Sequence, residues 1–163
     1  MTLARLESVD MAGDRPFPPR VSSFTRPFWD ALADGRLTTT RCEACGLPGF
    51  PPRPVCRACW SRAMRWETLA PGGTLYSFTR VHVVPGAFAA DAPYAIGIVD
   101  LHAGPRLMCR LVGEVETRHL DGPVEMVVLR YRDGPLFGAR PVAVAAIEPR
   151  CGPGSEPGSR TIG

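Results

Sequence analysis

The chain has 163 residues, a formal net charge of +3 and a hydrophobic fraction of 45%. These values are typical of a folded protein with one medium-sized domain or two small ones, and they exclude a largely disordered chain. No apolar run approaches the ~18 residues that a membrane-spanning helix needs, and the first residues lack the apolar core of a secretion signal, so we expect a cytoplasmic protein with no membrane partner.

The basic residues of the chain are all arginines, 19 in number, and no lysine is present. Chemistry that depends on a lysine side chain, such as Schiff-base formation or phosphate binding by a P-loop, is therefore excluded. The chain also contains 17 glycines and 18 prolines. Together they are about twice as frequent as in an ordinary protein, which favours many short turns over long helices.

The two ends of the chain differ in composition from its middle. Residues 1–24 are polar, contain several prolines and show no regular hydrophobic pattern, and we interpret them as a flexible arm. Residues 150–163 are rich in glycine, serine and proline, which is typical of a disordered tail. The ordered part of the chain is therefore expected between these two segments.

A short helix is predicted over residues 25–37. Thr25 is a suitable N-cap, and Gly35 can end the helix in the left-handed conformation. Phe28 and Trp29 lie on one side of this helix. They either pack onto the domain behind the helix or contact a partner protein, since aromatic residues are enriched in both settings.

Residues 38–68 contain two C-x2-C pairs that are separated by ten residues and consist of Cys42, Cys45, Cys56 and Cys59. Each pair can hold two thiolates on a tight turn, and two such turns facing each other form a tetrahedral metal site. We expect structural Zn²⁺, because thiolates fill all four positions and leave none for water or substrate. The spacing does not distinguish zinc from iron held in a similar site.

Other interpretations of the cysteine pairs are weaker. Without a secretion signal, a disulfide framework is not favoured. A dithiol redox site needs a single C-x2-C motif on a thioredoxin-like βα unit, which the sequence does not show, and free core cysteines would not explain the spacing. Trp60 follows the second pair where glycine is common, so we expect a slightly altered turn and an intact site.

The cysteine region is strongly basic. Six arginines and one acidic residue, Glu43, lie between Arg36 and Arg65. Such a surface can bind the phosphates of a nucleotide-bearing ligand, a nucleic acid or an acidic partner protein. It can also be a solvated face that only maintains solubility.

Residues 69–149 alternate between short apolar runs and turn signals. Clusters of glycine, proline and aspartate separate the runs, which favours five strands in a small all-β barrel or sandwich. The predicted strands cover Leu75–Val84, Tyr94–Leu101, Leu107–Val112, Val124–Tyr131 and Val142–Ile147.

We find no residue in the sequence that qualifies as catalytic. His82, His102 and His119 stand apart from any serine, cysteine or carboxylate at a motif spacing, whereas a catalytic histidine needs an orienting partner. Cys109 alternates with two leucines along its run and is expected to be a small buried residue.

The order of a short helix, a four-cysteine ribbon and a five-stranded barrel resembles the family catalogued as domain of unknown function thirty-five. The resemblance covers about residues 25–147. It is carried by the segments Pro27–Leu37, Arg41–Gly46, Phe50–Cys56, Gly73–His82, Pro93–Leu101 and Gly104–Met108. The resemblance implies a mostly β protein with an N-terminal short helix, a rubredoxin-like zinc ribbon and then a five-stranded OB-fold barrel.

The same resemblance implies an accessory role in acyl-CoA metabolism. Members of this family partner thiolase-like proteins, and the complexes carry out thiolysis, condensation, acyl transfer or retro-aldol cleavage of CoA thioesters. The small subunit is a scaffold that helps to shape the CoA channel, so only the four cysteines are carried over as functional residues.

From the resemblance and the charge pattern we derive two further expectations. The ribbon and the helix with Phe28 and Trp29 dock on the large subunit. Arg41, Arg53 and Arg57 bind the phosphates of CoA, because arginine forks suit phosphate groups.

Two alternatives belong to other classes of function. OB-folds and zinc ribbons both occur in modules that bind single-stranded nucleic acid. The barrel segment, however, balances its arginines with acidic residues, so a nucleic-acid partner is not favoured. A stand-alone thioesterase or hydratase would need an acid–base pair, which we do not find.

Overall fold

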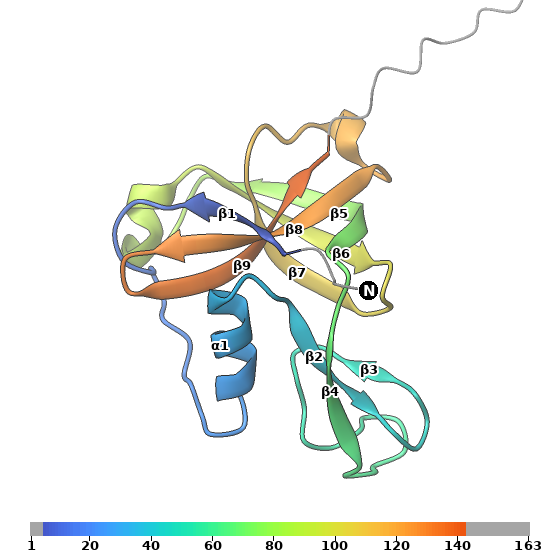
Figure 1. Cartoon of the computed structure of the whole chain (residues 1–163). Helices are drawn as coiled ribbons and strands as arrows, with labels where there is room; N and C mark the ends of the chain where they lie inside the picture. Colours follow the sequence, from blue (N-terminus) through green and yellow to red (C-terminus); the bar gives the residue numbers. More distant parts are fainter. Residues whose placement is uncertain (1–4, 143–163) are drawn as a thin grey trace, which may run out of the picture.

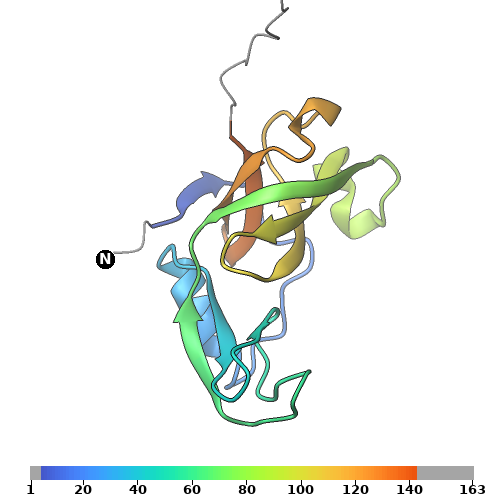
Figure 2. The same ribbon diagram turned by 90° about the vertical axis from the view of Figure 1, so that its right-hand side faces the viewer.

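The computed structural model describes residues 5–142 of the chain. A β-barrel forms one end of the molecule, and helix α1 and a three-stranded ribbon lie together at the other (Figure 1; Figure 2). No helix within the described residues is both long and apolar enough to span a bilayer. In chain order the strands and the α-helix are β1 (Glu7–Asp10), α1 (Arg26–Ala33), β2 (Thr38–Cys42), β3 (Pro48–Gly49), β4 (Met64–Thr68), β5 (Gly72–Val81), β6 (Tyr94–Leu101), β7 (Arg106–Leu111), β8 (Pro123–Tyr131) and β9 (Gly134–Pro141).

Strands β5 to β9 close into a five-stranded barrel. Hydrogen-bonded neighbours follow the order β8, β5, β6, β7 and β9, and β9 pairs with β8 again. Strands β7 and β9 run parallel, whereas the other neighbours in this ring are antiparallel. This closed five-stranded arrangement is that of an OB-fold. It confirms the predicted fold class, which is mostly β with one short helix.

The barrel interior is filled by alternate side chains, because successive residues of a strand point to opposite faces. In β6, Ala95, Val99 and Leu101 are buried, and the residues between them are half-exposed. Gly97 lies in the same inward row. A Cβ atom at Gly97 would come within 2.7 Å of Cδ1 of Leu111, so glycine is what allows this close packing.

The fifth barrel strand differs from the predicted one. The sequence predicts a strand over Val142–Ile147, but the strand that closes the barrel is β9, and residues 143–147 lie outside the described part. Strand β9 was not predicted, because its two prolines and two glycines lower its strand propensity. The strand forms nevertheless, since it pairs with both β8 and β7 and buries Ala139 in the core.

The flexible arm predicted for residues 1–24 is wrong at residues 6–10. Strand β1 pairs in parallel with residues 127–130 of β8, and Leu6 before it is buried in the core. Strand β5 pairs with β8 only over residues 123–125, so β1 satisfies backbone groups that β5 leaves unpaired. The tail predicted for residues 150–163 lies outside the described residues.

Helix α1 ends as its sequence indicates. Gly35 has a φ of +77°, and the N–H of Arg36 donates to the carbonyl of Ala31 at 2.8 Å, a bond that satisfies one of the last carbonyls of the helix. The start differs from the prediction, since Thr25 makes no side-chain cap. Its Oγ1 accepts a hydrogen bond from the N–H of Ser22 instead.

Phe28 is buried and is not available to a partner protein. It is 4% exposed, and its ring lies against Phe50 of the ribbon and Phe137 of β9, with ring centroids 6.1 Å apart in both contacts. The prediction that Phe28 binds a partner is therefore wrong, because the helix uses this residue to join the ribbon to the barrel. Trp29 is half-buried against the same core, and its contact with a partner stays a prediction.

The ribbon is a three-stranded sheet in the order β3-β2-β4. Two buried threonines of β2 connect this sheet to the segment that precedes the second cysteine pair. Oγ1 of Thr39 donates to the carbonyl of Gly49. Oγ1 of Thr40 donates to the carbonyl of Arg53 at 3.0 Å and accepts from its N–H at 2.9 Å. These bonds satisfy buried polar groups and fix the segment beside β2.

Candidate metal centre and basic cavity

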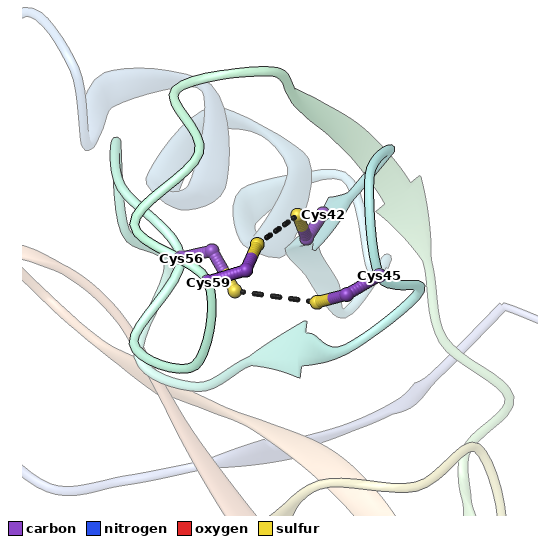
Figure 3. Close-up of side chains that lie close together, drawn as sticks. All are labelled: Cys42, Cys45, Cys56 and Cys59. Carbon is purple, nitrogen blue, oxygen red and sulfur yellow. Dashed lines mark hydrogen bonds between the residues drawn. The ribbon is translucent and has the colours of Figure 1, made fainter.

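The first cysteine pair lies on a turn that follows β2. The N–H of Cys42 donates to the carbonyl of Leu47 at 3.0 Å, and the N–H of Gly46 donates to the carbonyl of Cys42 at 2.9 Å. Gly46 has a φ of +74°, which is a left-handed conformation that glycine adopts at no steric cost. The turn brings Cys42 and Cys45 toward the second pair (Figure 3).

The second cysteine pair lies on a turn of the same kind. The N–H of Cys56 donates to the carbonyl of Ser61 at 2.9 Å, and the N–H of Trp60 donates to the carbonyl of Cys56 at 3.1 Å. Trp60 takes the place that Gly46 has in the first turn and has a φ of +60°. The substitution of tryptophan for glycine therefore leaves the hydrogen-bonded frame of the turn in place.

The four cysteines are positioned to bind one metal ion. Their sulfur atoms all lie within 4.8 Å of one another. Sγ of Cys42 lies 3.5 Å from Sγ of Cys59, and Sγ of Cys45 lies 3.5 Å from Sγ of Cys56 (Figure 3). A tetrahedral site with metal–sulfur bonds of ~2.3 Å has edges of ~3.8 Å. The arrangement therefore fits a tetrahedral metal ion, and a four-thiolate set leaves no position for a substrate.

Backbone N–H groups favour the charged form of one thiol in each pair. The N–H of Cys59 lowers the pKa of Cys56 to about 6, and the N–H of Cys45 lowers the pKa of Cys42. Although the N–H of Leu47 lowers the pKa of Cys45, the neighbouring thiols and burial outweigh it and raise this pKa to about 12. A bound cation removes the mutual effect of the four thiols on their pKa values, since it holds all four cysteines as thiolates.

A cavity of about 570 Å³ lies between the ribbon and the barrel. Its walls come from the ribbon segment 41–57 and from the turn between β6 and β7 with the first residue of β7. The structure thus brings the three arginines singled out from the sequence into one cavity and adds a fourth. These residues are Arg41, Arg53, Arg57 and Arg106.

Two of the four arginines are neutralised by carboxylates. Nη2 of Arg41 lies 2.6 Å from Glu67, and Nη1 of the same residue donates to the carbonyl of Gly46 at 2.6 Å. The hydrogen bond from Arg41, together with its charge, lowers the pKa of Glu67. Arg106 donates two hydrogen bonds to Asp100, at 2.5 and 2.7 Å. Both residues are therefore held in fixed positions at the edge of the cavity.

Arg53 and Arg57 keep their charge available to a ligand. Both residues are exposed, and neither forms an ion pair with a carboxylate of residues 5–142. A cavity with two unpaired guanidinium groups favours an anionic ligand, because each guanidinium can donate paired hydrogen bonds to a phosphate or carboxylate.

Sequence reasoning missed Arg106 because nothing near it in the chain marks a binding site. The residue follows the turn at Gly104, and only tertiary packing places this turn against the ribbon. One contact that does so is a 3.4 Å hydrogen bond from Nη2 of Arg41 to the carbonyl of Ala103. The guanidinium of Arg106 also lies over the ring of Tyr76, 3.8 Å from its centroid.

The candidate catalytic groups considered from the sequence do not come together in residues 5–142. His82 and His102 are exposed, and Nδ1 of His119 accepts a hydrogen bond from the N–H of Glu116. Cys109 is buried, as predicted, and burial raises the pKa of its thiol to about 12. A thiol with such a pKa is a poor nucleophile.

Both lobes of the structure match known domain families. The model described as the rubredoxin-like zinc ribbon domain of ChsH2 matches residues 29–65. The model described as the C-terminal OB-fold domain of ChsH2 matches residues 66–129. The two matches meet inside β4. The first covers the end of helix α1 and most of the ribbon, and the second covers the barrel up to residue 129 of β8 but not β9.

Relatives and a solved structure are similar to this chain over more than half of its length. A DUF35 domain-containing scaffold protein of Methanocaldococcus jannaschii is 33% identical over 99 residues, which cover 60% of this chain and 70% of the relative. The benzoylsuccinyl-CoA thiolase subunit BbsA of Geobacter metallireducens is 29% identical over 125 residues, covering 75% of this chain and 84% of BbsA. A chain in the structure of the Ltp2-ChsH2(DUF35) aldolase has a TM-score of 0.66 at 30% identity, covering 76% of this chain and 98% of that chain.

Proposed function

The chain belongs to the DUF35 family, and from this premise we propose that it is the non-catalytic subunit of a thiolase-like enzyme that acts on an acyl-CoA. The observation that carries the proposal is the arginine-lined cavity between ribbon and barrel. This cavity offers the positive charge of Arg53 and Arg57 to an anionic ligand, whereas the groups that could serve as nucleophile or base lie elsewhere. The chemistry is therefore assigned to the partner subunit.

In this proposal the four cysteines hold Zn²⁺, and the metal has a structural role. The donor set supports the assignment, because four thiolates at tetrahedral spacing suit zinc and leave it coordinatively closed. When bound, the ion links the two turns and so stabilises the ribbon. Elemental analysis of the purified protein distinguishes zinc from iron.

The proposed ligand site separates two roles among the arginines. Arg53 and Arg57 bind the phosphate groups of CoA, because their charges are unpaired. Arg41 and Arg106 hold the ribbon and the barrel wall in position through their bonds to Glu67 and Asp100. Apolar side chains of the same cavity, including Phe50, offer a surface for the uncharged pantetheine part of the ligand.

The partner in this proposal is a thiolase-like protein. BbsA is named as a subunit of a thiolase, and the Ltp2-ChsH2(DUF35) structure is that of an aldolase. The barrel of this chain also exposes large apolar side chains on strands β5 and β7, where Tyr76 is 52% and Met108 is 67% exposed. Exposed apolar surface of this kind favours association with another protein. We place the complex in the cytoplasm, where thiols stay reduced and can bind metal.

The reaction of the complex is thiolysis, condensation, acyl transfer or retro-aldol cleavage of a CoA thioester. These reactions share a thioester substrate, so one CoA site serves each of them. The acyl group is recognised by the partner, which in this proposal contributes the reacting side chains.

The test is to purify the chain from its native host together with the protein that accompanies it, and to measure CoA binding to the complex by calorimetry. We expect a thiolase-like partner. The double variant Arg53→Glu and Arg57→Glu should weaken CoA binding by a factor of about 10 or more, because each charge reversal removes a charge-assisted contact. Arg20→Glu is the matched control, since Arg20 is exposed but does not line the cavity. Turnover of a CoA thioester by the isolated chain would contradict the proposal.

A further inference from the structure

The two metal-binding turns share one backbone but differ at one residue. Gly46 and Trp60 both follow the second cysteine of a pair, donate their N–H to the carbonyl of the first cysteine and have positive φ values. Glycine is the residue that this conformation favours, and a residue with a Cβ atom is strained there. The second turn therefore carries a strain that the first turn avoids.

The fold gains little from the side chain of Trp60. The residue is 78% exposed, and its ring takes part in none of the aromatic contacts among residues 5–142. Trp66, on the same ribbon, contrasts with it, because Trp66 is 37% exposed and packs against the tilted ring of Phe24 with ring centroids 5.6 Å apart. A strained, exposed tryptophan that supports no packing is best explained by a role outside the chain.

The charge around Trp60 indicates what kind of surface it contacts. Arg53, Arg57 and Arg62 are exposed around the second turn, and the segment 50–64 contains no acidic residue. Tryptophan and arginine are the residues most enriched among those that dominate binding energy at protein interfaces. A partner that complements this surface has an apolar pocket bordered by carboxylates.

We propose that Trp60 is an anchor that inserts into an acid-bordered apolar pocket on the thiolase-like subunit. This inference rests on the proposed function, because it takes the partner from there. A protein fits the surface better than single-stranded nucleic acid does. Nucleic-acid channels present several aromatic rings in succession, whereas the other aromatic residue of segment 50–64 is Phe50, which packs against Phe28 and Phe137.

The experiment compares two variants with the wild-type chain, each loaded with metal. Trp60→Ala removes the side chain and keeps a strained Cβ atom, whereas Trp60→Gly removes both. Affinity for the thiolase-like subunit that accompanies the wild-type chain is measured by calorimetry, and thermal midpoints are measured on the chain alone. We expect both variants to bind at least ~10-fold more weakly, as for a central tryptophan anchor, and only Trp60→Gly to have a raised midpoint.

Phe17→Ala is the matched control, because Phe17 is 76% exposed but lies on the N-terminal segment beside the barrel. We expect its affinity for the partner to stay within about twofold of the wild type, since most interface truncations are nearly neutral. A third variant, Arg57→Glu with Arg62→Glu, should slow association and reduce its salt dependence, because it reverses the charge that the acidic border attracts.

Three outcomes would overturn the inference. Binding of both Trp60 variants within about twofold of the wild type shows that Trp60 is not an anchor, although the proposed function then stands. A lowered midpoint or lost metal in Trp60→Gly shows that the side chain serves the fold. Tight, salt-dependent binding of a single-stranded oligonucleotide that needs Trp60 shows that the surface around Trp60 binds nucleic acid. If the wild-type chain binds no thiolase-like subunit, the proposed function itself fails.

Discussion

Replacing Phe28 by alanine tests whether Phe28 holds the helix, the ribbon and the barrel together or binds a partner protein. Phe28 is 4% exposed. Its ring lies edge-on to Trp29, with centroids 4.9 Å apart, and close to Phe50 and Phe137. The substitution therefore opens a cavity where the helix, the ribbon and the barrel meet.

The expected cost follows from this environment. Truncation of a buried phenylalanine costs about 3–5 kcal/mol, and the site has rigid aromatic neighbours on three sides that cannot easily collapse into the space. A protein of this size has a total unfolding free energy of roughly 5–15 kcal/mol. We therefore expect Phe28→Ala to remove roughly a fifth or more of the stability and to lower the melting temperature by about 10 °C.

The assay is urea and thermal unfolding of the metal-loaded chain, followed by circular dichroism. Phe17→Ala serves as control, because Phe17 is 76% exposed and its loss should change stability by no more than ~0.5 kcal/mol. A cost below ~1 kcal/mol for Phe28→Ala, combined with weaker binding of the partner subunit, would refute the reasoning and restore Phe28 as a docking residue.

Three further predictions concern the ribbon and the helix end. Cys56→Ser should lose the metal, as measured by elemental analysis, and should disorder the ribbon in hydrogen-exchange experiments, because the tetrahedral set is then incomplete. Glu67→Gln should reduce stability by about 1 kcal/mol at pH 7. Arg41 lowers the pKa of Glu67 in the folded state. The ion pair therefore stabilises the fold at pH values above 4.5, the ordinary pKa of a glutamate, and this stabilisation is lost as the pH falls through the lower pKa that Glu67 has in the folded protein. Glu67→Gln should therefore flatten the acid side of a plot of unfolding free energy against pH, and an unchanged slope would contradict the ion pair. Gly35→Ala should cost about 1 kcal/mol in urea unfolding, because Gly35 has a φ of +77° and a Cβ atom would lie 2.7 Å from Cγ of Arg5. Equal stability would show that the helix end tolerates a left-handed alanine.

The features that could be predicted are those encoded by neighbouring residues. The cysteine pairs mark a candidate metal site through spacing alone, because a C-x2-C turn needs no distant contact to point two sulfurs the same way. Strand β6 was predicted with its observed bounds, since its apolar residues recur between clear turn signals. Gly35 likewise ends the helix through its own conformational freedom.

The features that could not be predicted depend on contacts between distant parts of the chain. Strand β1 contains one large apolar residue, Val9, and forms because β8 offers it backbone partners. Strand β9 has a weak strand pattern and forms because it closes the barrel. The periodicity of α1 showed that Phe28 faces one side, but only the folded structure shows that Phe50 and Phe137 cover that side. Arg106 enters the cavity for the same reason.

The parallel pairing of β1 with β8 affects how much conformational entropy the helix and the ribbon gain when a bound metal ion is released. Residues 18–71 connect the N-terminal segment that lies along the barrel to β5, and both β1 and β5 are hydrogen-bonded to β8. The segment that contains the helix and the ribbon is thus attached to the barrel at both of its ends and has no free end. When the ion is released, the segment gains less conformational entropy than a free end of equal length would. Rebinding of an ion then needs only the folding of a segment that both of its ends already hold beside the barrel.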